Sequence, residues 1–274
     1  MNLTQVEIAL LHAVAFEPLF LHDIIRPLVF PYLPLPLFSA EQLTEAFLEL
    51  QAKDFIAAVD ESVRRKGKDD PIPFVPLTKE SIELQFHIGQ EIHEAMTKRV
   101  GIDWSAIGRN ARISYRLTQS GGRAWEKMAS PEWDKFVDYS LHVIEDADAE
   151  PDGHARGHLV AATMETLENY INWTLRWGNN SSPSQYLESV TFGRAVRISS
   201  WKPLYWKTLD EGYQCSMETL GVHYQLPDED EQTVSQAERD EMDEHDQYFT
   251  WYKTPSVIQE LWDLSRKSSR SDQS

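Results

Sequence analysis

The chain has 274 residues, and its 44 Asp and Glu residues outnumber its 26 Lys and Arg residues, so the formal net charge at pH 7 is −18. Hydrophobic residues make up 41% of the chain, an ordinary share for a globular protein with a buried core. Nucleic acids and anionic membranes repel so acidic a chain, which argues against a protein that coats either. Because Cys215 is the single cysteine, an intrachain disulfide is excluded and we expect a cytoplasmic location.

Neither a leader sequence nor a membrane span is predicted. The first fifteen residues include Glu7 and lack a basic start, unlike a signal peptide. The apolar stretch 16–38 contains five prolines together with Glu17, Asp23 and Arg26, a composition unlike that of a spanning helix.

The first sixty residues predict three helices followed by a strand. Apolar residues between 3 and 14 repeat at helical spacing, and a second short helix fits residues 19–29. Ser39 is expected to begin a third helix, since Gln42 lies three residues later and completes a capping box. Residues 55–59 follow as a strand.

The next seventy residues predict a charged loop, an extended stretch and then a helix, a strand and a helix. Residues 60–70 include Arg64, Arg65, Lys66 and Lys68, residues 71–76 are expected to be extended, and a helix with an amphipathic pattern begins after Thr78. Residues 113–117 alternate between apolar and polar, as a strand with one buried face does. Thr118 is expected to cap a helix that ends before Pro131.

The second half predicts a helix, a polar break and a β-rich region. Helix is expected at 136–144, and the polar run 145–157 is the expected domain boundary. Residues 159–177 have a strong helical pattern. Tyr213, Cys215 and Met217 alternate with polar residues, which indicates a half-buried strand in which the thiol is inert packing. A short helix is expected before residue 264.

The predicted fold class is therefore α+β, mostly helical. Three parts are expected: an N-terminal domain over 1–145, a smaller C-terminal domain of helix and β-sheet over 146–264, and a flexible tail over 265–274.

Two segments resemble a bacterial winged helix–turn–helix protein of an uncharacterised family. Y-R-L-T-Q-S-G-G-R-A-W-E at 115–126 resembles the last strand and helix of that domain, and S-A-E-Q-L-T-E-A-F-L-E-L at 39–50 is similar to its second helix. The resemblance covers roughly the first half of the chain. It implies a winged-helix-like N-terminal half in which the helix before 55–59 is the recognition helix. The wing would contain an inserted helix, which departs from the compact pattern.

If the resemblance implies DNA binding, the basic residues of the wing, the last strand and the last helix would contact phosphates. These residues are Arg64, Arg65, Lys66, Lys68, Arg112, Arg116 and Arg123. The expected recognition helix instead presents Glu41, Glu45 and Glu49, which repel phosphate. The plainer interpretation is that the basic residues are solvated loop charges.

A second candidate surface is the acidic segment 228–246, which has ten acidic residues and one basic residue. A basic partner would suit it. The residues that would contact this partner are Asp228, Glu229, Asp230, Glu231, Asp240, Glu241, Asp243 and Glu244.

Patterns for catalysis or cofactor binding are missing from the sequence. It has no phosphate-binding loop, no dinucleotide-binding glycine pattern, no nucleophile elbow and no C-x-x-C. His87 and Glu91 could share a helix face, but His93 could not join them, so we expect no metal and no cofactor. The dense aromatic residues of the second half are expected in a core, with a protein-contact patch as the alternative.

Two functions remain open. The first is a non-enzymatic cytoplasmic protein-binding module, and one concrete version is an immunity-like acidic inhibitor of a basic toxin or nuclease. The alternative is a winged-helix DNA-binding transcriptional regulator. No membrane partner is expected under either.

Overall fold

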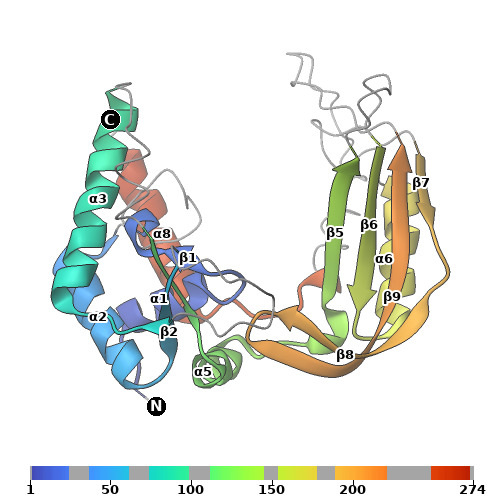
Figure 1. Ribbon diagram of the computed structural model, residues 1–274, viewed down its shortest axis with the longest axis horizontal. Helices are drawn as coiled ribbons and strands as arrows, with labels where there is room; N and C mark the ends of the chain where they lie inside the picture. The colour runs from blue at the N-terminus through green and yellow to red at the C-terminus, as the bar shows by residue number, and fades with distance from the viewer. Residues whose placement is uncertain are drawn as a thin grey trace. The chain divides into compact units, whose positions relative to one another are not determined.

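The computed structural model describes residues 2–24, 37–61, 74–98, 112–144, 154–177, 189–220 and 248–271 (Figure 1). The chain forms two compact units, each described by itself below. Unit 1 comprises residues 1–130, 204–207 and 254–274. Unit 2 comprises residues 131–203 and 208–253.

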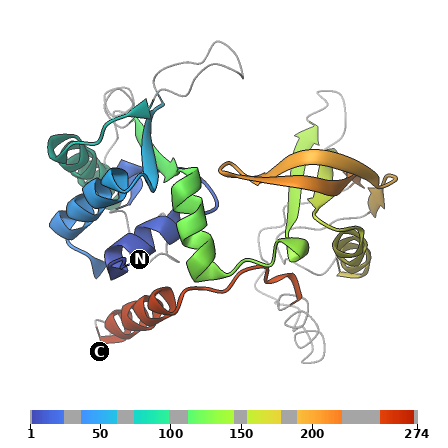
Figure 2. The same ribbon diagram turned by 90° about the horizontal axis from the view of Figure 1, so that it is seen from below.

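Unit 1 combines a small antiparallel sheet with helices. Its strands are β1 (Leu19–Phe20), β2 (Ile56–Asp60), β3 (Phe74–Val75) and β4 (Ile113–Leu117), in the order β1-β4-β2-β3. Its helices are α1 (Gln5–Ala13), α2 (Ala40–Ala52), α3 (Lys79–Thr97), α5 (Gln119–Ala129) and α8 (Ser256–Ser271), with a 3-10 turn at Leu21–Asp23. Figure 2 shows β4 leading directly into α5.

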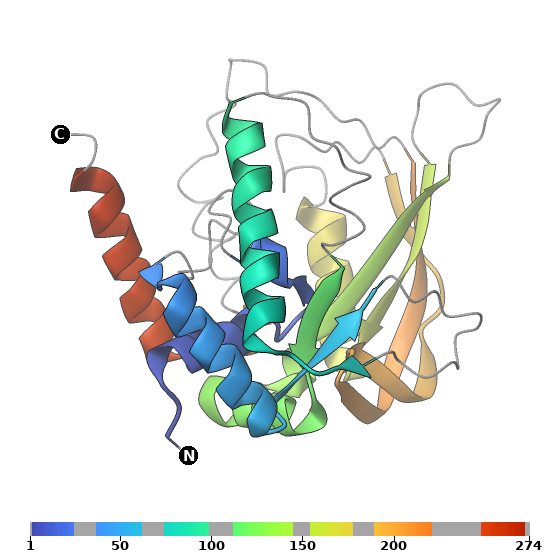
Figure 3. The ribbon, with the colours of Figure 1, turned by 60° about the vertical axis from the view of Figure 1, so that its left-hand side comes forward.

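Tyr115 of β4 is at the centre of the unit 1 core. Its ring meets Phe47 of α2 edge to face at a centroid distance of 4.7 Å, and Phe47 lies 6.3 Å from Phe86 of α3. All three are buried. Because aromatic side chains bury large apolar areas, this row holds α2 and α3 side by side against the sheet (Figure 3).

The helices of unit 1 begin where the sequence places capping residues. Thr4, Ser39 and Thr78 each accept a hydrogen bond from the backbone N–H three residues later, and each forms a full capping box. Thr118 caps α5 in the same way, through the N–H of Gly121 at 3.0 Å. The helices expected after Ser39, Thr78 and Thr118 are therefore confirmed.

The turn between β8 and β9, at 204–207, belongs to unit 1. The Tyr205 hydroxyl donates to the carbonyl of Val14 at 2.5 Å and accepts from the N–H of Leu117 at 2.7 Å. The Trp206 indole donates to the carbonyl of Ala15 at 2.8 Å. A Cβ atom on Gly122 would lie 2.0 Å from the Trp206 ring, so only glycine leaves room for it.

Unit 2 is an antiparallel sheet with helix α6 on one of its faces (Figure 1). Its strands are β5 (Val137–Ile144), β6 (His154–Ala161), β7 (Ser189–Phe192), β8 (Val196–Leu204) and β9 (Lys207–Leu220). The order is β5-β6-β9-β7, and β8 pairs with β9. The helix is α6 (Met164–Trp177), and a 3-10 turn at Trp133–Lys135 precedes β5. Leu159, Cys215 and Met217 pack against Leu167 of α6 in the core.

The expectation of a mostly helical protein is wrong, because the structure is α+β with an antiparallel sheet in each unit. Residues 137–144, expected to be helical, are strand β5. Val137 and Tyr139 alternate there with Asp138 and Ser140, a period of two that favours a strand. The apolar residues 137, 141 and 144 also fit helical spacing, so the sequence alone is ambiguous there.

The helix expected at 159–177 begins later, since residues 154–161 form strand β6 and α6 starts at Met164. The Thr163 hydroxyl accepts from the N–H of Thr166 at 3.1 Å and so caps this helix. Residues 19–24, expected to begin a helix, instead form β1 and the 3-10 turn. The domain boundary predicted at 145–157 lies between β5 and β6, which are paired strands, and the division into units falls at residue 130.

Within the ranges given above, no helix combines the length and apolar character needed to cross a membrane.

Replacing Tyr205 with Phe is expected to lower the free energy of unfolding by about 1–3 kcal/mol. The change leaves the N–H of Leu117 and the carbonyl of Val14 without the hydroxyl that now bonds both. The measurement is urea denaturation followed by tryptophan fluorescence. As a control, Tyr248→Phe removes a hydroxyl that bonds Asn169 at an exposed site and should cost less than about 0.5 kcal/mol. Equal losses in the two variants would contradict the proposed anchoring.

Candidate functional site

The strongest surface feature of unit 1 is the acidic character of α2 and α3. Seven glutamates on these two helices are all exposed, whereas Lys79 is their only lysine and neither contains arginine. They are Glu41, Glu45 and Glu49 on α2 and Glu80, Glu83, Glu91 and Glu94 on α3. The buried faces of the helices determine this arrangement: Leu43, Phe47 and Leu50 face the core, so the glutamates between them face solvent.

Three of these seven carboxylates lie within 4.0 Å of a lysine ammonium. Lys79 lies 3.8 Å from Glu83, and Lys98 lies 2.9 Å from Glu94. All four side chains are more than half exposed, so each pair contributes little to stability and solvent screens it. Among the residues that the structure describes, Glu41 and Glu45 form no ion pair. The two helices therefore keep a net negative surface.

Lys53, at the end of α2, points toward a buried carboxylate of α1. Its ammonium pairs with Glu7, which is almost fully buried, and lies 3.9 Å from Glu49. Glu7 also accepts from the N–H of Thr4 at 2.7 Å in the α1 capping box. Because Lys53 compensates a buried carboxylate, this cation serves the fold, and the α2 surface keeps its acidic character.

The basic residues proposed to contact DNA are only partly described. Arg64, Arg65, Lys66 and Lys68 lie outside the described residues. Arg112, which precedes β4, and Arg116 of β4 are half-buried, and the guanidinium of Arg116 lies 5.1 Å from the centre of the Phe74 ring. Arg123 is exposed on α5. These three do not sit on the helix that the resemblance identifies as the recognition helix.

The acidic residues proposed to contact a partner also lie outside the described residues. This holds for Asp228, Glu229, Asp230, Glu231, Asp240, Glu241, Asp243 and Glu244. The acidic surface that the structure does describe is the one on α2 and α3. The sequence pattern revealed its α2 glutamates, but only as an argument against DNA binding.

His87 and Glu91, expected on one helix face, lie next to each other on α3. Nε2 of His87 lies 3.4 Å from a carboxylate oxygen of Glu91, and both side chains are well exposed. The part of the chain that is described contains no group of three or more His, Cys, Asp or Glu side chains positioned to hold a metal ion. Cys215 is buried in the unit 2 core, and burial raises the pKa of its thiol, which opposes formation of a reactive thiolate.

Aromatic residues of the second half pack against one another in unit 2. Phe136 lies 4.7 Å from Trp251 and 6.0 Å from Trp201, and Trp133 lies 5.0 Å from Trp251, measured between ring centroids. Glu132 supports this cluster, since its N–H donates to the carbonyl of Trp251. The cluster thus holds the residues just before β5 against Trp251.

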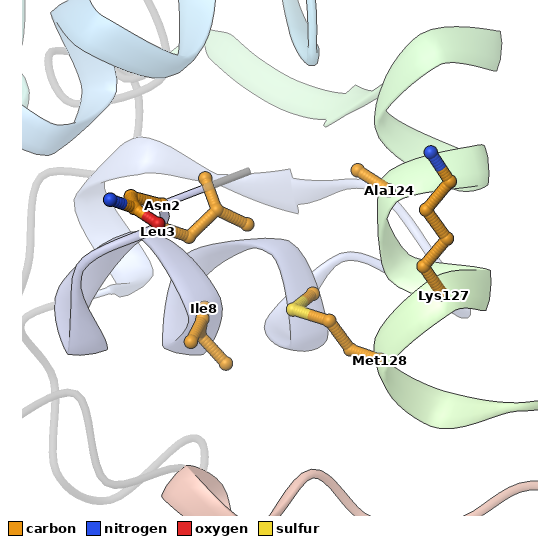
Figure 4. A pocket seen from close by; sticks show the side chains of 6 residues that line it. All are labelled: Asn2, Leu3, Ile8, Ala124, Lys127 and Met128. Atoms are coloured by element: carbon orange, nitrogen blue, oxygen red, sulfur yellow. The ribbon is translucent and has the colours of Figure 1, made fainter.

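A hollow of about 440 Å³ lies between the chain's start, α1 and α5 (Figure 4). Leu3, Ile8 and Met128 give it an aliphatic lining, and Lys127 contributes one ammonium group. It is too poor in polar groups for catalysis, because a reaction needs several that converge on one point. Sequence reasoning missed it, since Leu3 and Ile8 follow the same spacing as the buried residues of α1.

His12 of α1 is a buried titratable group in the unit 1 core. Its Nδ1 accepts from the Trp125 indole at 3.3 Å, which requires a neutral ring at that nitrogen. Burial lowers the pKa of His12 from 6.5 to about 4. At neutral pH the side chain is uncharged and acts in packing.

A scan against protein-family models, a search of curated proteins and a search of solved structures each found no match to this chain. Functional inference therefore rests on the surfaces described above.

Replacing His12 with Gln should reduce the loss of stability that follows acidification. Because the pKa of His12 in the folded state is about 4 and its ordinary value is 6.5, the unfolded chain takes up the proton first as the pH falls. Stability is therefore lost between pH 6.5 and 4, by up to about 3 kcal/mol. Urea denaturation at several pH values measures this loss. The stability difference between wild type and variant should shrink across this interval, and parallel curves would refute the assignment.

Proposed function

We propose that this protein is a non-enzymatic binding module whose unit 1 captures a basic protein partner through α2 and α3. The single observation that carries the proposal is the set of seven exposed glutamates on these two helices, against Lys79 on α3 and Lys53 and Lys98 at the helix ends. Complementary charge across an interface accelerates association and excludes partners of the wrong sign.

The winged-helix resemblance is kept as part of the proposal. The two strands that it requires, β2 and β4, are antiparallel neighbours with five paired residues. The helix before β2 is α2. In a winged-helix regulator, the helix at this position enters the DNA groove. Here Glu41, Glu45 and Glu49 are exposed on it, and they would face phosphates at close range. The scaffold suits binding, and its charge suits a basic polypeptide better than DNA.

One concrete version of the proposal is an inhibitor that uses the acidic surface of α2 and α3. An acidic helix pair that covers a basic active site would neutralise a nuclease or a toxin in the manner of an immunity protein. The acidic residues at 228–231 and 240–244 would extend the same attraction. Association should weaken as salt screens the charges.

The alternative of a DNA-binding regulator depends on the basic residues of the wing, the last strand and the last helix, which are Arg64, Arg65, Lys66, Lys68, Arg112, Arg116 and Arg123. It predicts steep salt-dependent binding of any duplex. One experiment compares the two functions, because the first predicts binding of a basic peptide and the second predicts binding of duplex DNA.

Fluorescence anisotropy should detect binding of a labelled Lys- and Arg-rich peptide at low salt, and much weaker binding of a labelled random duplex. The double variant Glu41→Gln, Glu45→Gln should weaken peptide binding by about threefold to tenfold, since each rim charge contributes a fraction of a kcal/mol. The matched control is Glu165→Gln, Glu168→Gln, which removes two exposed glutamates from the start of α6 in unit 2.

The control should leave peptide affinity within about twofold of wild type. A third variant, in which the eight acidic residues at 228–231 and 240–244 become amides, separates the contribution of that segment. Tighter binding of the duplex than of the peptide would contradict the proposal and favour the regulator. Equal effects of the α2 and α6 variants would remove α2 from the site.

A further inference from the structure

The hollow in unit 1 has two facing walls and an aliphatic lining (Figure 4). Ala124, Lys127 and Met128 come from α5, and Leu3 and Ile8 come from the opposite wall. Leu3, Ile8 and Met128 are each partly exposed, so apolar surface inside the hollow is open to solvent. A ligand with an apolar chain would remove this surface from water, which favours binding.

A buried hydrogen bond beside the hollow holds its two walls together. The Trp125 indole donates to Nδ1 of His12 at 3.3 Å, and both side chains are buried. His12 lies one helical turn after Ile8 in α1. Trp125 directly follows Ala124 in α5. The hollow is therefore formed before any ligand arrives, which lowers the cost of binding.

Lys127 gives the hollow a positive charge that no described carboxylate neutralises. The other unit 1 lysines whose side chains are described each lie within 4.0 Å of a carboxylate, and they are Lys53, Lys79, Lys98 and Lys207. Arg123 is exposed one turn before Lys127 on α5, and it too has no ion pair within the described ranges. Like charges at this helical spacing repel each other, and an anion beside them relieves the repulsion.

We propose that this hollow binds a straight-chain aliphatic carboxylate of about eight carbons. The alkyl chain lies on Leu3, Ile8 and Met128, and the carboxylate accepts hydrogen bonds from the Lys127 ammonium. The volume of about 440 Å³ equals that of about fifteen water molecules, which leaves room for such a chain.

The lining selects this ligand chemistry over its relatives. No acidic side chain lines the hollow, and its two polar side chains are Asn2 and Lys127. A cationic amphiphile would meet the Lys127 ammonium and be repelled, and a neutral alcohol would leave that charge unpaired. Because the whole chain carries a net charge of −18, it repels anions in general, so affinity for a carboxylate depends on the local cations.

Isothermal titration calorimetry of the full chain with octanoate measures the binding. We expect a dissociation constant of about 0.1–1 mM, a value typical of a ligand of this size. Butanoate should bind at least about tenfold more weakly, because it lacks half of the alkyl chain. Octylammonium has the same chain with the opposite charge, and we expect no measurable binding.

Three variants of the hollow test its role. Lys127→Gln should weaken octanoate binding by about threefold to tenfold, whereas Lys127→Arg keeps the charge and should stay within about twofold of wild type. Met128→Glu places a carboxylate inside the hollow and should abolish binding. The matched control is Lys202→Gln, which removes an exposed lysine from β8 and should leave the affinity unchanged.

Circular dichroism should show all four variants folded, because Lys127, Met128 and Lys202 are exposed or partly exposed. A wild type that gives no heat with octanoate at millimolar concentrations would overturn the proposal. So would octylammonium binding as tight as that of octanoate, or equal affinities in Lys127→Gln and Lys202→Gln. Wild-type affinity in Met128→Glu would place any bound octanoate outside the hollow and would equally refute it.

Discussion

The antiparallel pairing of β2 with β4 is the interaction on which unit 1 depends. It joins residues 56–60 to residues 113–117, although more than fifty residues separate the two strands in the sequence. The pairing places Tyr115 in the core and positions α5, because Thr118 donates to the carbonyls of Phe55 and Asp54 where β2 begins. Gly121 lies so close to Phe55 that a Cβ atom would be 1.8 Å from its carbonyl oxygen. Closing so long a loop costs entropy, and the buried strand pair must offset that cost.

The acidic surface follows from the same core. Once Leu43, Phe47 and Leu50 of α2 turn inward, the helix has one face left for solvent, and the sequence places glutamate at 41, 45 and 49 on it. The helix dipole also stabilises negative charge near a helix N-terminus. The first-turn carboxylates of α2 and α3 therefore do not destabilise their helices. The only described cation near the end of α2, Lys53, compensates the buried Glu7. The solvent face of α2 thus presents carboxylates.

The sequence predicted the starts of α2, α3 and α5 because a helix cap depends only on residues three apart in the chain. Ser39 with Gln42, Thr78 with Ser81, and Thr118 with Gly121 are caps that a sequence reader can see, and each begins the expected helix. β5 was missed because the five apolar residues among its eight fit either period until the pairing with β6 decides between them. The position of the 204–207 turn in unit 1 depends on Tyr205 reaching backbone groups nearly two hundred residues away, which no local pattern encodes. The α2 part of the candidate surface was readable as a row of glutamates on the exposed helix face. The glutamates of α3 were not recognised as part of the same surface, because their place beside α2 depends on tertiary packing.

The most direct test of a basic-partner surface on α2 and α3 is a nuclear magnetic resonance titration of the isotope-labelled chain with a basic peptide and, separately, with duplex DNA. Backbone amide signals report which helix meets each ligand. The account predicts that the peptide shifts signals of Ala40–Ala52 and Lys79–Thr97, and that these shifts fade as salt is raised. DNA should leave them unchanged. Shifts caused by DNA around Arg112, Arg116 and Arg123, with α2 and α3 silent toward the peptide, would contradict it.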